Sequence, residues 1–134
     1  MKIKLINFSG GKPVRKHYND AGADVAVPNY TEFPPHSATK VPLGFGVEIP
    51  DGFMGCIFPR TSVANQGLTC ELPPIDSGYR GEIHAIVTNH TTKTLSMEKG
   101  ERVGQLVIVP VVLADFVEDL GEERGAGAFG STGR

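Results

Sequence analysis

Glu82-Ile83-His84-Ala85-Ile86-Val87-Thr88 alternates with a period of two, as a strand with one buried face does. Lys2–Leu5 and Asp24–Val27 alternate in the same way and predict two further strands. The period of a helix appears nowhere at length, and only the segment from Thr61 to Gln66 suits a helical turn. We therefore expect an all-β protein built from short strands.

Glycine and proline separate these runs. The 134 residues include 17 Gly and 10 Pro, well above ordinary usage, and this content excludes long helices. The turn signals are spaced as in a many-stranded β domain. They stand at Ser9–Gly11, Phe33–Pro35, Leu43–Gly44, Pro50–Gly52 and Lys99–Glu101.

Size and charge limit the class of protein. A chain of 134 residues fits one domain that needs neither disulfides nor a structural metal. The net charge of -2 provides no broad basic field for a nucleic-acid backbone. Cys56 and Cys70 form no CxxC pair, and no stretch suits a membrane-spanning helix or a signal peptide. We expect a cytoplasmic protein that binds neither nucleic acid nor membranes.

The C-terminal part of the chain contains three consecutive segments of different composition. Leu106–Leu113 is apolar at consecutive positions, which predicts a strand that is buried on both faces or crosses a subunit interface, and that breaks or bends at Pro110. Asp115–Glu123 carries five acids and no base. Arg124–Arg134 has almost nothing to bury, so we expect a mobile arm. Its composition suits a nucleotide clasp, or a tail without function.

Three positions offer groups for an anion or its metal. Arg60 and the hydroxyls that follow it open the expected helical turn, whose free N–H groups point at a phosphate; a surface arginine beside a helix cap is the alternative. Asp24 suits an outer-shell carboxylate for Mg²⁺ or a plain turn acid. The amide of Gln105 donates to a phosphate or only to neighbouring backbone.

The segment Leu72–Glu82 predicts a hairpin tip followed by an inward strand. Asp76 in this segment is a candidate for activating a water molecule, or an Asx-turn residue. Tyr79 stacks on a sugar or fills the core. His84, on the strand that follows, is a surface or core histidine, or a ligand contact.

Five segments, AGAD, PRTS, IDSGYRGE, GERVGQL and RGAGAFGSTG, occur in this order between Ala21 and Gly133. Each alone is a weak signal, but together they resemble the five motifs of the trimeric dUTPase family. The resemblance implies a single-domain distorted jelly-roll β-barrel over residues 1–123 and a flexible nucleotide-clasping arm over residues 124–134. It also implies a homotrimer whose active sites lie at subunit boundaries and are closed by an arm from another subunit.

The implied reaction is Mg²⁺-dependent hydrolysis of dUTP to dUMP and pyrophosphate by attack of water at the α-phosphorus. It limits uracil in DNA and supplies dUMP for dTMP synthesis. By position, Asp76 is the general base, Tyr79 packs on the deoxyribose, and Asp24 contacts the Mg²⁺ hydration shell through water. The residues that match the family's nucleotide contacts are Arg60, Thr61, Ser62, Cys70, Pro74, Ile75, Tyr79, His84, Gln105, Arg124, Phe129, Ser131 and Thr132.

The sequence departs from the family pattern in three ways. Thr61-Ser62 stands where Ser-Gly is usual, and Ala128 stands where glycine is usual. Cys70 and Pro73 replace an asparagine that reads uracil and a glycine. Cysteine lacks the paired donor and acceptor of an amide, and proline has no N–H. Two alternatives therefore stay open: a pyrophosphatase for dCTP or a modified pyrimidine, and a non-catalytic nucleotide-sensing regulatory protein.

Overall fold

The computed structural model of the chain describes residues 1–121. Over these residues the chain forms ten strands and one five-residue helix, so the prediction of an all-β protein is confirmed. In chain order the elements are β1 (Lys4–Asn7), β2 (Ala23–Ala26), β3 (Thr31–Phe33), β4 (Ser37–Pro42), β5 (Phe45–Glu48), β6 (Phe53–Pro59), α1 (Thr61–Asn65), β7 (Leu68–Cys70), β8 (His84–Asn89), β9 (Leu95–Met97) and β10 (Arg102–Pro110).

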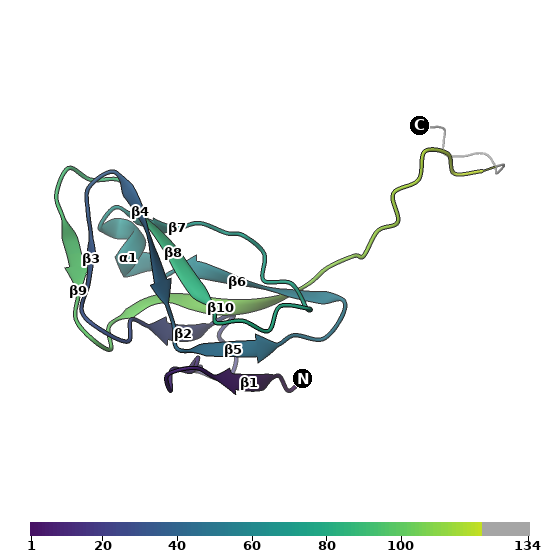
Figure 1. Cartoon of the computed structure of the whole chain (residues 1–134), viewed down its shortest axis with the longest axis horizontal. Coiled ribbons are helices and arrows are strands. Elements are labelled where there is room, and N and C mark those ends of the chain that lie inside the picture. The colour runs from purple at the N-terminus through teal and green to yellow at the C-terminus, as the bar shows by residue number, and fades with distance from the viewer. Residues whose placement is uncertain (122–134) are drawn as a thin grey trace.

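The strands pair into four antiparallel sheets, in the orders β1-β5, β2-β10-β6, β3-β9 and β4-β8-β7 (Figure 1). Within residues 1–121 these sheets do not join into one closed barrel. A common cluster of buried side chains holds them together, and each buried aliphatic or aromatic side chain contributes about 1.5–3 kcal/mol. The cluster includes Val25, Phe33, Val41, Phe45, Ile57, Leu68, Val87, Met97 and Leu106.

Strand β8 is the predicted alternating run, shifted toward the C-terminus. Ala85, Val87 and Asn89 are buried on one face, and the residues between them are half-buried. Glu82 and Ile83 precede the strand because Ile83 bonds elsewhere: its N–H donates to the Phe45 carbonyl and its carbonyl accepts from Leu43, both at 2.9 Å. The alternation therefore identified the strand, and long-range backbone pairing decided where it begins.

Strand β10 ends at Pro110, as the sequence predicted. The prediction of burial on both faces is wrong within the chain, because Val107–Val109 and Val111 are only half-buried and Val112 and Leu113 are exposed; the subunit-interface alternative stays a prediction. Val112 is 90% and Leu113 75% accessible. After Pro110 the chain leaves the strands and runs away from them (Figure 1). Within residues 1–121, Val112 and Leu113 are therefore exposed rather than packed into the core.

The turns and the short helix lie close to where the sequence predicts them. Four of the five turn signals lie between strands, the fifth begins at Phe33, the last residue of β3, and α1 falls inside the predicted segment Thr61–Gln66. Cys56 and Cys70 are both buried and unpaired. In the part of the chain that the structure describes, no helix has the length and apolarity that crossing a membrane requires.

A β-bulge in β10 determines on which face of the strand the side chain of Arg102 lies. Gln105 pairs with Asp24 and Gly104 with Val25, but Arg102 rather than Val103 pairs with Ala26. Val103 is the extra residue of the bulge and is fully buried. Because a bulge shifts the alternation of a strand by one residue, Arg102 emerges on the same face as Asp24 and Gln105.

Candidate functional site

Three segments that are distant in sequence meet at a hollow of about 480 Å³, here called the Asp24 hollow. The segments are β2, the start of α1, and β10. The structure thus brings together every internal residue that the sequence suggested for an anion. The lining consists of Asp24, Arg60, Thr61, Ser62, Asn65 and Gln105.

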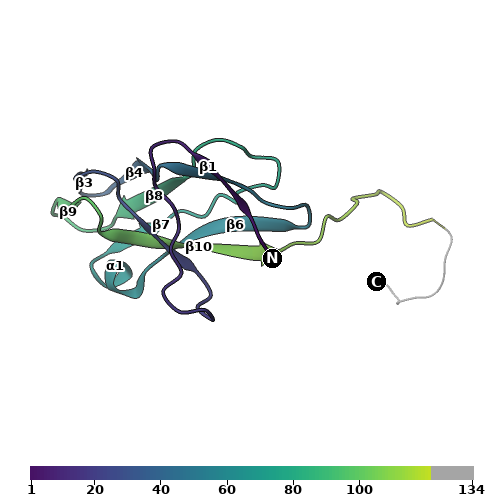
Figure 2. The ribbon, with the colours of Figure 1, turned by 90° about the horizontal axis from the view of Figure 1, so that it is seen from below.

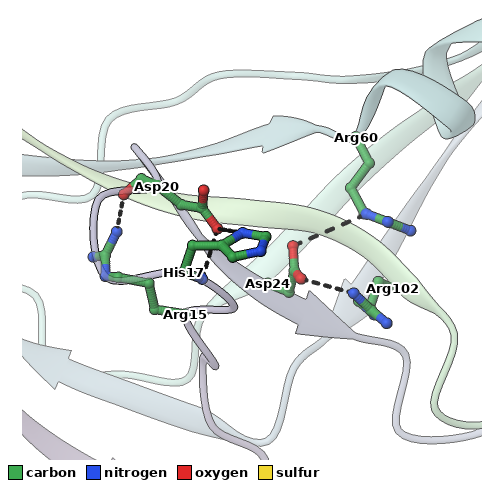
Figure 3. A network of polar contacts seen from close by, with 6 residues as sticks. All are labelled: Arg15, His17, Asp20, Asp24, Arg60 and Arg102. Atoms are coloured by element: carbon green, nitrogen blue, oxygen red, sulfur yellow. Dashed lines mark hydrogen bonds and ion pairs between the residues drawn. The ribbon is translucent and has the colours of Figure 1, made fainter.

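Asp24 lies between two arginines (Figure 3). Its Oδ2 accepts a hydrogen bond from Nη1 of Arg102 at 3.0 Å, and its Oδ1 lies 3.9 Å from Nε of Arg60. The carboxylate therefore offsets the two positive charges and orients both side chains. Arg102 was not among the residues predicted for the site, although it lies in the quoted segment GERVGQL. Only the bulge in β10 reveals on which face it emerges.

Gln105 rests against Gly22. A Cβ atom at position 22 would lie 2.6 Å from Oε1 of Gln105 and 2.8 Å from its Cβ, so any side chain there would displace the amide. Gly22, two residues before Asp24, thus leaves room for the Gln105 amide beside the Asp24 hollow. The two residues that line the hollow from neighbouring strands, Asp24 and Gln105, are paired directly in the β2–β10 ladder.

Arg60 is itself the N-cap residue of α1, with extended φ and ψ of -77° and 153°. Among the residues that the structure describes, no side chain caps this end of the helix, and its first turn contains no acid. The N-terminal N–H groups and the exposed hydroxyls of Thr61 and Ser62 therefore stand beside the arginine. The alternative of a surface arginine beside the cap is thus corrected, because Arg60 is the cap residue and lines the Asp24 hollow; a phosphate contact by Arg60 stays a prediction.

A second hollow, of about 210 Å³, surrounds the segment between β7 and β8 and is here called the Asp76 hollow. Its lining consists of Lys40, Pro73, Pro74, Ile75, Asp76, Tyr79, Glu82, Ile83 and His84. Among residues 1–121 the Asp76 carboxylate accepts no hydrogen bond, and only its main-chain carbonyl accepts one, from Tyr79 N–H at 3.1 Å. The Asx-turn alternative is therefore not observed, and the carboxylate is available to a ligand or water.

The segment that carries Asp76 is fixed at two points. Ile75 exchanges two backbone hydrogen bonds with Gly55 of β6, at 2.8 and 2.9 Å. On the other side of Asp76, Oγ of Ser77 donates to Oδ1 of Asp51 at 3.1 Å. These contacts hold the backbone of an exposed acid without using its carboxylate.

Tyr79 lies at the surface, with 43% of its area accessible, so it does not fill the core. Its Oη donates to the Glu82 carbonyl at 2.6 Å, which fixes the direction of the ring. Nδ1 of His84 lies 3.0 Å from the same carbonyl oxygen. Because a carbonyl only accepts, this nitrogen carries the proton and Nε2 of the neutral ring remains an acceptor.

Cys70 lies at the end of β7 and is only 8% accessible. Burial raises the pKa of its thiol to about 11, and the neighbouring charge of Glu71 adds to this effect. Cys70 does not line the Asp76 hollow, whereas Pro73 and Pro74 do. A base contact by the Cys70 thiol stays a prediction.

Asp24 is the acid available to a metal in its hollow. Within the described part of the chain, no three His, Cys, Asp or Glu side chains gather as a metal site. Mg²⁺ commonly retains water and takes phosphate oxygens as ligands, so one carboxylate beside an anion hollow fits an ion that arrives with its phosphates.

The remaining predicted contacts lie outside the described residues. They are Arg124, Phe129, Ser131 and Thr132, together with the departing position Ala128. The two hollows that are described share no lining residue. Each therefore presents part of the predicted set, with the acid Asp76 in one and the predicted phosphate contacts in the other.

Comparison with known proteins gives a consistent result. The dUTPase family model matches residues 10–133. The chain is 37% identical to the deoxyuridine 5'-triphosphate nucleotidohydrolase of Tropheryma whipplei strain Twist and 38% identical to that of Clostridium tetani, covering 100% of this chain and 97% of each relative. A mutant dUTPase from phage phi11 of S. aureus, whose structure shows a coordinated structural Mg(II) ion, superposes with a TM-score of 0.81. That match has 22% identity and covers 90% of this chain and 99% of the other.

Proposed function

Since the chain belongs to the dUTPase family, we infer that it is a dUTP diphosphatase, which hydrolyses dUTP to dUMP and pyrophosphate. The observation that carries this conclusion is the full-length match to nucleotidohydrolases of this substrate.

The assembly is a homotrimer with shared active sites. One dUTP molecule needs a nucleoside site and a phosphate site side by side, whereas the Asp76 and Asp24 hollows of one chain have no residue in common. The exposed apolar side chains after Pro110 support association, because such side chains gain about 25 cal/mol per Å² when a second copy covers them. We assign the four sheets of each subunit to a distorted jelly roll.

The backbone of His84 reads the base. The carbonyls of Ile86 and Ile83 accept from Glu71 on the β7 side and from Leu43 on the β4 side, at 2.8 and 2.9 Å. N–H and C=O groups alternate between the two sides of an antiparallel strand, so those of His84 face the β7 side.

On that side stand Pro73 and Pro74, which have no N–H to offer the His84 carbonyl. Uracil supplies the missing partners: its N3–H donates to the His84 carbonyl, and one of its exocyclic carbonyl oxygens accepts from the His84 N–H. Cytosine has no N3–H, so this arrangement favours uracil despite the cysteine at position 70.

Tyr79 and Asp76 act on the nucleotide from the same segment. The exposed ring of Tyr79, held by its Oη bond to Glu82, packs on the deoxyribose and leaves no room for a 2'-hydroxyl. The carboxylate of Asp76, which accepts no hydrogen bond from residues 1–121, takes a proton from the water that attacks the α-phosphorus. The bond between this phosphorus and the bridging oxygen breaks, and pyrophosphate leaves.

The Asp24 hollow holds the phosphates. Arg60, the N-terminal groups of α1 and the Gln105 amide donate to phosphate oxygens. Mg²⁺, with Asp24 reaching its hydration shell through water, would offset phosphate charge and favour attack at phosphorus. The segment from Arg124 onward closes over the ligand, with Arg124 at the distal phosphates, Phe129 over the base, and Ser131 and Thr132 as additional donors.

A panel of nucleoside triphosphates tests this function. We expect pyrophosphate release from dUTP, and weak or no release from dCTP and UTP, in the presence of Mg²⁺. A calorimetric titration with a nonhydrolysable dUTP analogue and its dCTP counterpart measures base selection without turnover. Comparable kcat/KM for dCTP would favour the altered-specificity alternative, and tight binding without any release would favour the regulatory alternative.

A further inference from the structure

A third hollow, here called the Lys12 hollow, lies beside the Asp24 hollow and has a volume of about 390 Å³. Asp24 lines both hollows and separates them. Arg102, which pairs with Asp24, faces the new hollow. The complete lining is Lys12, Val14, Lys16, Asp24, Ala26, Gly100 and Arg102.

Two lysines reach this hollow because the loop before β2 is paired to that strand. Val14 N–H donates to the Asp24 carbonyl at 2.9 Å, and Asp24 N–H donates to the Val14 carbonyl at 2.8 Å. Side chains of an extended segment alternate, so Lys12 and Lys16 share the face of Val14. Pro13 and Arg15 line a different hollow, as this alternation requires.

The loop has a defined form between Lys16 and the strand. Oδ2 of Asp20 accepts from the His17 N–H at 2.9 Å, and Arg15 donates to the Asp20 carbonyl (Figure 3). Figure 2 shows this early segment as a loop that projects beyond the strands. Lys16 therefore belongs to a folded loop whose base is bonded to β2.

The charge of the Lys12 hollow is strongly positive. Lys12, Lys16 and Arg102 face one carboxylate, Asp24, which is already 3.0 Å from the Arg102 guanidinium. Neither lysine forms an ion pair within residues 1–121. Such a concentration of like charge attracts a compact ligand of several negative charges.

We propose that the Lys12 hollow binds the inorganic pyrophosphate that the reaction releases, as an exit site beside the phosphate site. The inference rests on the proposed function, since hydrolysis of dUTP supplies the pyrophosphate. While the diphosphate is bonded to the nucleoside, the Asp76 hollow restricts where it lies. Once that bond breaks, the diphosphate is free to move past Asp24. Its contact with Arg60 is then replaced by contacts with Arg102 and the two lysines.

The test compares the full-length protein with the double variant Lys12→Gln/Lys16→Gln. We expect the inhibition constant of inorganic pyrophosphate and its calorimetric Kd to rise at least about tenfold, since two charge-assisted hydrogen bonds to the diphosphate are lost. KM for dUTP stays within about twofold. The matched control is Lys2→Gln/Lys4→Gln, which removes the same charge from exposed positions outside the Lys12 hollow. Thermal unfolding of both double variants verifies that each is folded.

Each other result overturns the proposal. Unchanged pyrophosphate binding would show that the two lysines do not contact the pyrophosphate. An equal loss of affinity in the control variant would show that the effect comes from the overall charge of the protein. A KM for dUTP that rises together with the pyrophosphate constants would make the hollow part of the substrate site. If the wild-type protein does not hydrolyse dUTP, the proposed function fails, whereas the calorimetric titration still decides whether pyrophosphate binds here.

Discussion

The ring of Tyr79 lies over Gly81, so closely that a Cβ atom on Gly81 would stand 2.5 Å from the Tyr79 Oη. The same hydroxyl donates to the carbonyl of Glu82 at 2.6 Å. One short segment thus orients the aromatic ring and leaves its outer face accessible. Position 81 therefore requires glycine, because the Tyr79 ring occupies the space that a side chain would need.

The variant Gly81→Ala tests the orientation of the ring. The added methyl group displaces Tyr79 and breaks its bond to Glu82. We expect KM for dUTP to rise by up to about tenfold, since an aromatic contact is worth about 0.5–1.5 kcal/mol. Steady-state kinetics with Gly78→Ala as the control checks this, because a Cβ atom at Gly78 meets nothing within 4 Å. Equal kinetics in the two variants would contradict the role of Gly81.

Replacing the proposed general base gives the sharpest kinetic prediction. We expect Asp76→Asn to lower kcat by about 10²- to 10⁴-fold, because an amide does not take the proton of the attacking water. Calorimetric binding of a nonhydrolysable dUTP analogue should persist. The control Asp115→Asn removes an exposed carboxylate from the segment after β10 and should leave kcat unchanged. Near-normal turnover in Asp76→Asn would refute the assignment.

Deleting the segment from Arg124 onward tests whether this segment contributes to catalysis without contributing to the stability of the fold. The buried core lies within residues 1–121, so the truncated chain should unfold at nearly the temperature of the full chain. Its kcat/KM for dUTP should fall steeply, because Arg124 and Phe129 no longer contact the ligand. Calorimetric unfolding and pyrophosphate release measure the two properties independently. Full activity of the truncated chain would be incompatible with a clasping arm.

The buried thiol of Cys70 predicts how stability changes in alkali. Its pKa is raised from 9.0 to about 11 in the folded chain, so the folded state holds this proton more tightly than the unfolded state. The contribution to stability is complete below about pH 9 and is lost as the pH rises toward about 11. Urea unfolding at pH 8 and at pH 10.5 measures the fall.

The variant Cys70→Ala should show a smaller decrease over the same pH interval, since it has no thiol to titrate. A thiol reagent should also react slowly with the native protein at pH 8, because the thiolate is the reactive form. Rapid modification of the folded wild-type chain at Cys70 would contradict the burial of this side chain.

Local patterns in the sequence predicted four of the ten strands, β1, β2, β8 and β10, and the turns between strands. A period of two, turns rich in glycine and proline, and Pro110 act on neighbouring residues, so they identified strands near their observed places and the end of β10. The order of the five segments identified the family, which the comparisons confirm. None of these signals depends on which distant residues come into contact.

The environments of the site residues were decided only by the tertiary structure. Arg102 and Asp24 are 78 positions apart, and a one-residue bulge at Val103 brings them onto one face. Exposure of Tyr79 and burial of Cys70 likewise depend on how distant strands pack. Alternation along a strand says that two faces exist, but contacts between remote segments determine which face meets the core and which meets a ligand.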